Sequence, residues 1–257
     1  MPKRFYKTGF SLTEVLMAVG ILAVGMTFIA GVFPVAIYFT TVASEHTIAA
    51  VLVDEAFGKV KLYAGFDNVN LNMLGTDYLK DFNDPDIFAA VDDIGDNDFT
   101  YPSTEGDTSG KSYYWTALCR RLDPNDRLVQ VTVFVCRKTR NGLSYRAPLP
   151  QDPHNDVVAW PMPVRVEVQL GGNNNELEID DAEKGWVNDG ATIVDDQTGD
   201  IYRVLERYRS TNTDPDRDRV ILLDRDWEGG NKIWVVPPAI NGGRYPCVAV
   251  YQKILRF

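Results

Sequence analysis

The segment that decides the fold spans residues 10–33 and reads FSLTEVLMAVGILAVGMTFIAGVF. It contains one charged side chain, Glu14, in a run of 24 residues. As an α-helix at ~1.5 Å per residue the run is about 36 Å long, which is enough to cross the hydrocarbon core of a bilayer. We therefore predict a membrane-spanning helix near the N-terminus.

The residues before this segment carry only positive charge, namely Lys3, Arg4 and Lys7. Positive flanks stay on the cytoplasmic side of a membrane, so the rest of the chain is expected outside. A secretory signal peptide has a shorter apolar core of ~7–15 residues, followed by a small-residue cleavage site. Here the run is longer and ends in Val-Phe-Pro at residues 32–34. The pattern therefore favours an anchor over a conventional signal peptide.

Glu14 is the anomaly of the segment, because a lone carboxylate in a membrane span is costly and points to a function. The motif KTGFSLTEVL at residues 7–16 resembles the class III signal of type IV prepilins and type II secretion pseudopilins. The resemblance covers residues 5–60. The small residues within 18–25 are also similar to those of minor pilins and minor pseudopilins, and small residues allow close helix packing.

This resemblance implies how the N-terminus is processed. In the family a prepilin peptidase cuts after the glycine, here Gly9, on the cytoplasmic side, and methylates the new N-terminal residue, here Phe10. Glu14 then becomes the fifth residue of the mature chain, where the family keeps a glutamate. In a filament its carboxylate neutralises the α-amino group of a neighbouring subunit, so neither charge stays unpaired in an apolar core. A plain signal-anchor with an incidental glutamate is the alternative interpretation.

The resemblance also implies a function. The chain is expected to be a structural subunit and not an enzyme: a minor pseudopilin or minor pilin of a type II secretion pseudopilus or a type IV pilus. Its expected partners are prepilin peptidase, other pilins or pseudopilins in a helical filament, the inner-membrane assembly platform and the lipid bilayer. The expected location is the bacterial cytoplasmic membrane, single-pass, with the leader cytoplasmic and the head periplasmic or extracytoplasmic. A pilin-anchored adhesive or ligand-binding surface protein is the second candidate.

The second half of the helix has a different pattern. Pro34 lacks an amide donor and is expected to kink or locally melt the helix. Beyond it, apolar positions recur at three- and four-residue steps, which predicts one buried face. That face comprises Val35, Phe39, Val42, His46, Ala49, Val53, Phe57, Val60 and Ala64. Gly65 is the expected C-cap, so the domains begin with a leader at 1–9 and a helix at 10–65. His46 is expected to be a structural residue on that face.

A β-sheet head is predicted at residues 66–172. Strand-like segments at 112–122 and 128–138 flank the turn sequence Asp-Pro-Asn-Asp, and a third strand is expected at 164–170. An antiparallel sheet packed on the long helix gives an α+β fold class. If Leu122 pairs with Arg127, Cys119 lies opposite Gln130 and Cys136 lies opposite Tyr113.

The three cysteines, Cys119, Cys136 and Cys247, allow at most one intrachain disulfide. Under the register above, Cys119 and Cys136 are not opposite one another, so a bond between them is not expected. Three buried thiols are an equally open alternative. The chain has no CxxC pair and only two histidines, His46 and His154, which argues against a structural zinc site.

The C-terminal residues 173–257 are predicted to form a separate small β-barrel or sandwich. Short strands are expected at 176–179, 191–194, 201–208, 219–223, 232–236 and 248–255, with turn sequences between them. Trp186, Trp227 and Trp234 discriminate between the two functions. An exposed aromatic groove favours ligand binding, whereas tryptophans in the core favour the assembly role.

Charge and motifs exclude several other functions. Removing the three cations of the leader from the formal net charge of −10 leaves −13, which disfavours nucleic-acid binding. The head loop is rich in aspartate, and a calcium site there is conceivable, although its spacing is not that of an EF-hand. Its members are Asp81, Asp84, Asp86, Asp92, Asp93, Asp96 and Asp98. The phosphate-loop-like run at 106–112 has the wrong glycine spacing, and no GxSxG or HExxH motif occurs.

Overall fold

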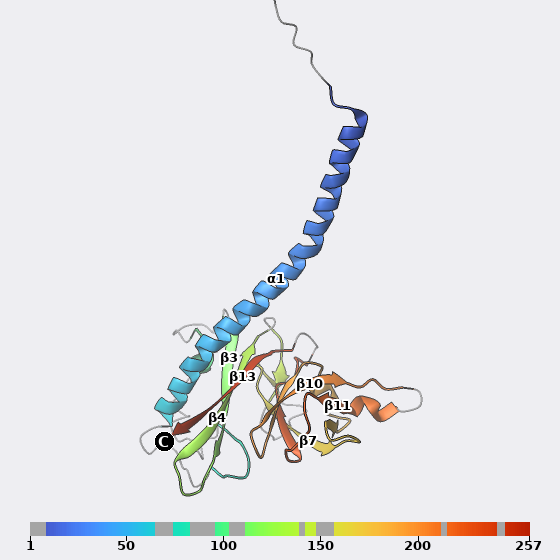
Figure 1. The fold of residues 1–257 in the computed structure, drawn as a ribbon. Helices are drawn as coiled ribbons and strands as arrows, with labels where there is room; N and C mark the ends of the chain where they lie inside the picture. Colours follow the sequence, from blue (N-terminus) through green and yellow to red (C-terminus); the bar gives the residue numbers. More distant parts are fainter. Residues whose placement is uncertain are drawn as a thin grey trace, which may run out of the picture. The chain divides into compact units, whose positions relative to one another are not determined.

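The structure is a computed structural model that describes residues 9–64, 74–82, 96–102, 111–138, 142–147, 157–211, 215–240 and 245–257. It confirms the α+β class, with one long helix and antiparallel β-sheets (Figure 1). The chain divides into two compact units, Met1–Thr47 and Ile48–Phe257. Within the second unit a closed six-stranded barrel accompanies the sheet, so the head is more than a single sheet.

Helix α1 extends over Leu12–Tyr63 and agrees with the predicted helix at 10–65, whose expected C-cap Gly65 lies outside the described residues. Its last turns, in the second unit, bury Ala49, Leu52, Ala56 and Val60 completely. The prediction that this face begins at Val35 is wrong, because Val35, Phe39 and His46 are exposed. Periodicity identifies an apolar face but not how far along the helix a partner covers it.

The head sheet has the strand order β1-β3-β4-β13, and the short strand β2 pairs with β3. The strands are β1 (Lys80–Asp81), β2 (Thr100–Tyr101), β3 (Tyr113–Arg121), β4 (Leu128–Arg137) and β13 (Cys247–Arg256). The predicted turn between β3 and β4 is confirmed. Asp123 accepts a hydrogen bond at its side chain from the Asn125 amide (2.7 Å) and at its carbonyl from the Asp126 amide (3.2 Å).

The register of β3 and β4 differs by one residue from the prediction. Cys119 lies opposite Val131, not Gln130, and Cys136 lies opposite Tyr114, not Tyr113. The shift arises because the Leu122 amide donates to the Leu128 carbonyl (3.0 Å), which lengthens the loop at the end of the ladder. Cys119 and Cys136 still do not face one another.

The barrel closes in the order β10-β11-β8-β7-β12-β9, with every pair antiparallel. Its strands are β7 (Val164–Leu170), β8 (Glu176–Ile179), β9 (Thr192–Asp195), β10 (Ile201–Arg207), β11 (Val220–Leu223) and β12 (Lys232–Val235). Inward-facing residues such as Val166, Leu177 and Ile193 are fully buried in its core. The remaining elements are short: η2 (Asp96–Phe99), β5 (Tyr145–Arg146), β6 (Val157–Val158), η4 (Lys184–Trp186) and η5 (Pro215–Arg219).

The expected boundary between head and module at residues 172 and 173 does not match the strand pairing. Strand β7 was expected in the head sheet but belongs to the barrel, and β13 was expected in the module but pairs along the whole of β4. Figure 1 shows β13 beside β4, with β7, β10 and β11 in the barrel. The barrel is therefore inserted between two neighbouring strands of the sheet. Proximity in sequence suggested the wrong partner for both strands.

The head sheet is covered on both faces. Trp115, Ala117 and Val133 pack with Ala49, Leu52 and Val60 of the helix in one hydrophobic cluster. The alternate side chains point to the other face. There Leu118, Phe134 and Cys136 pack with Val194, Trp234 and Val236 of the barrel. This second cover explains why β4 is buried along nearly its whole length.

Polar contacts from the turn after β9 fix the barrel to the sheet. The Asp196 carbonyl accepts a hydrogen bond from the Leu79 amide (2.8 Å), and the Gly199 carbonyl accepts one from Gln252 Nε2 (2.8 Å). Gly199 has a φ of +74°, and a Cβ there would lie 2.5 Å from Gln130 Nε2. The backbone conformation therefore favours glycine, and a Cβ there would also displace the end of the Gln130 side chain.

Candidate functional site

The first turn of α1 brings the predicted processing and assembly residues together. Gly9 and Phe10 precede the helix, and Phe10 is 82% exposed. Ser11 caps the helix, because its side-chain oxygen accepts a hydrogen bond from the Glu14 amide (3.2 Å) and its carbonyl accepts from the Glu14 and Val15 amides (3.1 and 3.2 Å). Glu14 thus sits at the positive end of the helix dipole, a favourable place for a carboxylate.

The Ser11 cap was not anticipated, although the sequence carries a signal for it. Serine followed three residues later by glutamate is the pattern of a capping box, in which the two residues cap one another's amides. Here Ser11 and Glu14 have that spacing, and the Ser11 half of the arrangement is present. The backbone of Glu14 is therefore held by the Ser11 cap, independently of any contact that its carboxylate makes.

The surface of α1 beyond Glu14 is apolar and exposed. The helix is long and apolar enough to span a membrane by length and composition, and none of its most apolar window is buried. Large side chains along it remain 50–80% exposed, including Leu12, Leu16, Ile21, Leu22, Phe28, Ile29 and Phe33. An exposed apolar surface of this size requires cover from lipid or protein. No neighbour within the described chain supplies that cover.

Pro34 does not interrupt the helix. The hydrogen-bonded helix continues through it from Leu12 to Tyr63, so the expected local melting does not occur. Proline removes one backbone donor, and a helix this long retains its remaining hydrogen bonds on either side. A kink at Pro34 stays a prediction.

No metal centre emerges from the residues that the structure describes, which contain no group of three or more His, Cys, Asp or Glu side chains able to hold a metal ion. Asp84, Asp86, Asp92 and Asp93 of the conceivable calcium loop lie outside the described residues, as does most of the 106–112 run. Asp98 is engaged otherwise: its side chain lies 3.4 Å from Lys59 Nζ, and its carbonyl accepts from Trp115 Nε1 (3.0 Å).

Two of the three barrel tryptophans, Trp186 and Trp234, are core residues. Trp186 is 3% exposed and Trp234 is 4% exposed, and the Trp234 Nε1 donates to Asp196 Oδ1 (2.7 Å). Trp227 is half-buried, packs on Tyr202 with ring centroids 4.7 Å apart and donates to the Gly230 carbonyl (3.1 Å). Trp186 and Trp227 therefore pack with the barrel core, and Trp234 packs between the barrel and the sheet. Trp186 also lines a surface pocket together with Arg146.

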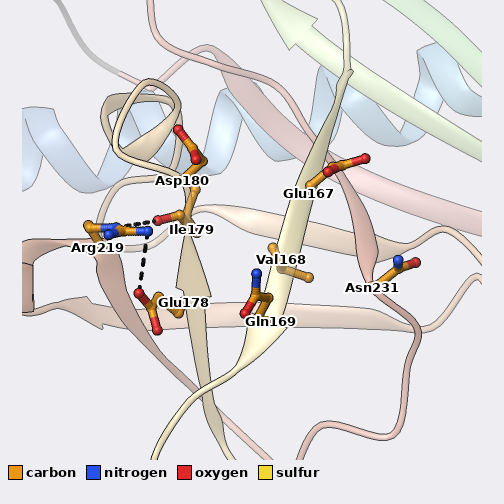
Figure 2. Close-up of a pocket in the computed structure, with 8 residues that line it drawn as sticks. All are labelled: Glu167, Val168, Gln169, Glu178, Ile179, Asp180, Arg219 and Asn231. Atoms are coloured by element: carbon orange, nitrogen blue, oxygen red, sulfur yellow. Dashed lines mark hydrogen bonds and ion pairs between the residues drawn. The ribbon is translucent and has the colours of Figure 1, made fainter.

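A polar pocket of about 200 Å³ lies on the barrel wall, between β7 and β8 (Figure 2). Arg219 bonds there to the Ile179 carbonyl (3.1 Å) and lies 3.4 Å from Glu178, while Glu167 lies 3.1 Å from Lys232. The lining contains three carboxylates, Glu167, Glu178 and Asp180, and one cation, Arg219, so it keeps an excess of negative charge. The lining contains no histidine, cysteine or serine, which are the usual members of a nucleophile–base pair.

The titratable groups with shifted pKa values have structural causes. Hydrogen bonds from Asn173 and from the Tyr208 hydroxyl (2.8 Å) lower the pKa of Glu176, whose backbone closes the β7–β8 turn. Burial and the nearby Asp81 raise the pKa of Cys119. Both shifts follow from hydrogen bonding and burial within the fold.

Comparison with known proteins gives no relative: no protein-family model, no curated protein and no solved structure matches this chain. The functional argument therefore depends on the chain's own residues. The feature with the most specific chemistry is the start of α1, where Gly9 and Phe10 precede an exposed apolar helix and Glu14 lies in its first turn.

Proposed function

We propose that this chain is a pilin-like structural subunit, a minor pseudopilin or minor pilin, which is cut after Gly9 and methylated at Phe10. The observation that carries the proposal is the start of α1. A single carboxylate, Glu14, occupies the first turn of an apolar helix whose surface is exposed. A membrane anchor alone does not need that carboxylate, whereas an assembly contact does.

The apolar surface of α1 suits two environments in succession, first lipid and then the helices of other subunits. Before assembly the lipid bilayer covers it, and the cations at Lys3, Arg4 and Lys7 favour a cytoplasmic leader. After assembly the helices of neighbouring subunits replace the lipid. Gly20, Gly25 and Gly31 favour such packing, because a Cβ at each would meet nothing within 4 Å in this chain and their small size admits a neighbouring backbone.

Glu14 provides the specificity of that step. Cleavage after Gly9 creates an α-amino cation at Phe10, and the carboxylate of Glu14 on an adjacent subunit is its complement. In an apolar filament core an unpaired charge is costly, so the pair fixes the axial position of each entering subunit. The Ser11 cap holds the helix start in one conformation and thereby orients Glu14.

The second candidate, a surface protein that binds a ligand through an aromatic groove, gains no support from the barrel. Trp186 and Trp234 are buried in its packing, which favours the assembly role. The barrel is then an additional module carried by the filament subunit.

Intact-mass and N-terminal analysis of the protein from its native membrane tests the proposal. The expected product is a mature chain that begins with N-methylated Phe10. A chain that retains Met1, or one that is cut beyond Pro34, would overturn the assignment.

Charge pairing by Glu14 has a separate test. We expect Glu14→Gln to be processed normally but to enter filaments about tenfold less or worse, because the neighbour's amine loses its partner. Glu14→Asp, which keeps the charge, is the matched control and should retain part of the incorporation. Equal incorporation of the glutamine and wild-type chains would contradict the pairing.

A further inference from the structure

Cys136 and Cys247 are Cα partners in the β4–β13 ladder, at the point where its register shifts between Cys247 and Ala249. At the next position the Arg137 amide donates to the Pro246 carbonyl (2.8 Å), so the cysteines occupy the adjacent non-hydrogen-bonded site. The Cys136 and Cys247 thiols are within hydrogen-bond reach of one another despite the irregularity, and regular antiparallel partners at such a site have Cα atoms ~4.5 Å apart. That spacing lies within the range of roughly 4.4–6.8 Å that a disulfide tolerates.

The two sulfur atoms also share one environment. Cys136 is fully buried in the cluster between the sheet and the barrel, and the half-buried Cys247 packs against the same cluster. Burial raises the pKa of the Cys136 thiol, and contact with the Cys247 thiol raises it further. Cys119 lies in the helix-facing cluster on the opposite side of the sheet. The chain therefore contains one facing pair and one separate thiol.

We propose that Cys136 and Cys247 are the site of an intrachain disulfide, formed by exchange with the disulfide of a thiol oxidoreductase, and that Cys119 remains a thiol. Disulfides form and persist outside the cytoplasm. The inference thus rests on the proposed function to the extent that it requires the head to be extracytoplasmic.

The exchange begins at Cys247, the more exposed of the two. Its thiolate attacks one sulfur of the oxidant's disulfide, and the other oxidant sulfur leaves and takes up the proton that Cys247 lost. The Cys136 sulfur then attacks the Cys247 sulfur, which breaks the bond to the oxidant. The second oxidant sulfur leaves and takes up the proton of Cys136. The two cysteines lose two electrons, and the oxidant's disulfide is reduced to two thiols.

The position of the bond gives it a structural role. All six barrel strands, from Val164 in β7 to Val235 in β12, lie between Cys136 and Cys247 in the sequence. The bond closes the chain at the base of the insertion and holds β13 in the sheet even when the barrel opens. Closing so long a loop restricts the unfolded chain strongly.

Peptide mapping without reduction tests the proposal on the full-length protein. Trypsin places the cysteines in three separate peptides, 112–120, 128–137 and 245–253. The protein is taken from native membranes under an alkylating agent, and a second sample is purified in detergent and incubated with oxidised glutathione. We expect peptides 128–137 and 245–253 to be linked in both samples, and 112–120 to be alkylated after denaturation.

Two variants serve as controls. Cys119→Ser should retain the linked peptides, whereas Cys247→Ser should lose them. Absence of the linked peptides from both wild-type samples, or a link to 112–120, would overturn the pairing and leave the proposed function intact. A link after glutathione treatment with free thiols in the native sample would overturn the native disulfide together with the external placement of the head.

Discussion

The two units of the chain differ in which side chains they expose: the first exposes apolar side chains, and the second buries even some carboxylates. In α1 before residue 42, large apolar side chains such as Leu22 and Phe28 are more than half exposed. In the unit Ile48–Phe257 even the carboxylates Asp195 and Asp196 are almost completely buried, with hydrogen-bond partners inside the chain. These buried carboxylates of the head are thus hydrogen-bonded within the chain. The apolar surface of α1, by contrast, is left uncovered by the residues that the structure describes.

Deletion of residues 1–47 tests this contrast most strongly. We expect the remaining chain to be soluble without detergent and to keep a cooperative unfolding transition, because residues 48–257 form a compact unit with their own cores. Gel filtration without detergent and circular dichroism on heating are the measurements. Aggregation of the truncated chain would show that the head also depends on the first unit.

Matched leucine substitutions compare the two halves of α1. Leu52→Ala should lower the free energy of unfolding of the head by about 2–5 kcal/mol, because Leu52 is fully buried between helix and sheet. Leu22→Ala, at a residue 58% exposed, should change it by less than about 0.5 kcal/mol. Urea titration of both full-length variants in detergent measures the difference, and similar losses would contradict the division.

Two glycines offer a second matched pair. Gly199→Ala should destabilise the head by about 1–2 kcal/mol, because its left-handed backbone opposes a Cβ and the end of the Gln130 side chain must move aside. Gly25→Ala meets no atom within 4 Å and should leave the head unchanged. The thermal unfolding midpoint measures both. An unaffected Gly199→Ala variant would mean that the turn after β9 does not hold the barrel as described.

The smallest expected effect is on the pH dependence of the head's stability, through Glu176. The pKa of Glu176 is lowered in the folded head, so the stability it contributes is present above its ordinary pKa of 4.5 and is lost as the pH falls below that value. Glu176→Gln should remove that part of the acid dependence, about 1 kcal/mol. Unfolding midpoints at pH 7 and pH 3 measure it, with the exposed Glu228→Gln as control. An unchanged pH dependence in Glu176→Gln would exclude this role.

Local features of the fold were predictable from the sequence. The alternation of residues and the flanking turns placed β7 at 164–170 and β8 at 176–179 without error, and the other long strands within one or two residues. The helix start was predictable too, because the motif around Gly9 and Glu14 is local. Even the unanticipated Ser11 cap had a readable pattern.

The features that could not be predicted from the sequence are contacts between residues far apart in the chain. The pairing of β13 with β4 joins segments more than one hundred residues apart, and no local pattern of β13 distinguishes the sheet from the barrel. The register of β3 and β4 depended on one extra hydrogen bond beyond the turn. The facing of Cys136 and Cys247 follows from that long-range pairing, so residue spacing alone did not predict it.

The barrel is inserted at a point where two paired strands of the sheet end and begin. Because the end of β4 and the start of β13 are adjacent strands, ~4.8 Å apart in a sheet, an ordinary two- to five-residue hairpin turn can join them. The barrel is therefore an insertion at a single connection, the one between β4 and β13. Another compact domain with close termini could replace the barrel at this position only if it also covered Leu118 and Phe134 on that face of the sheet.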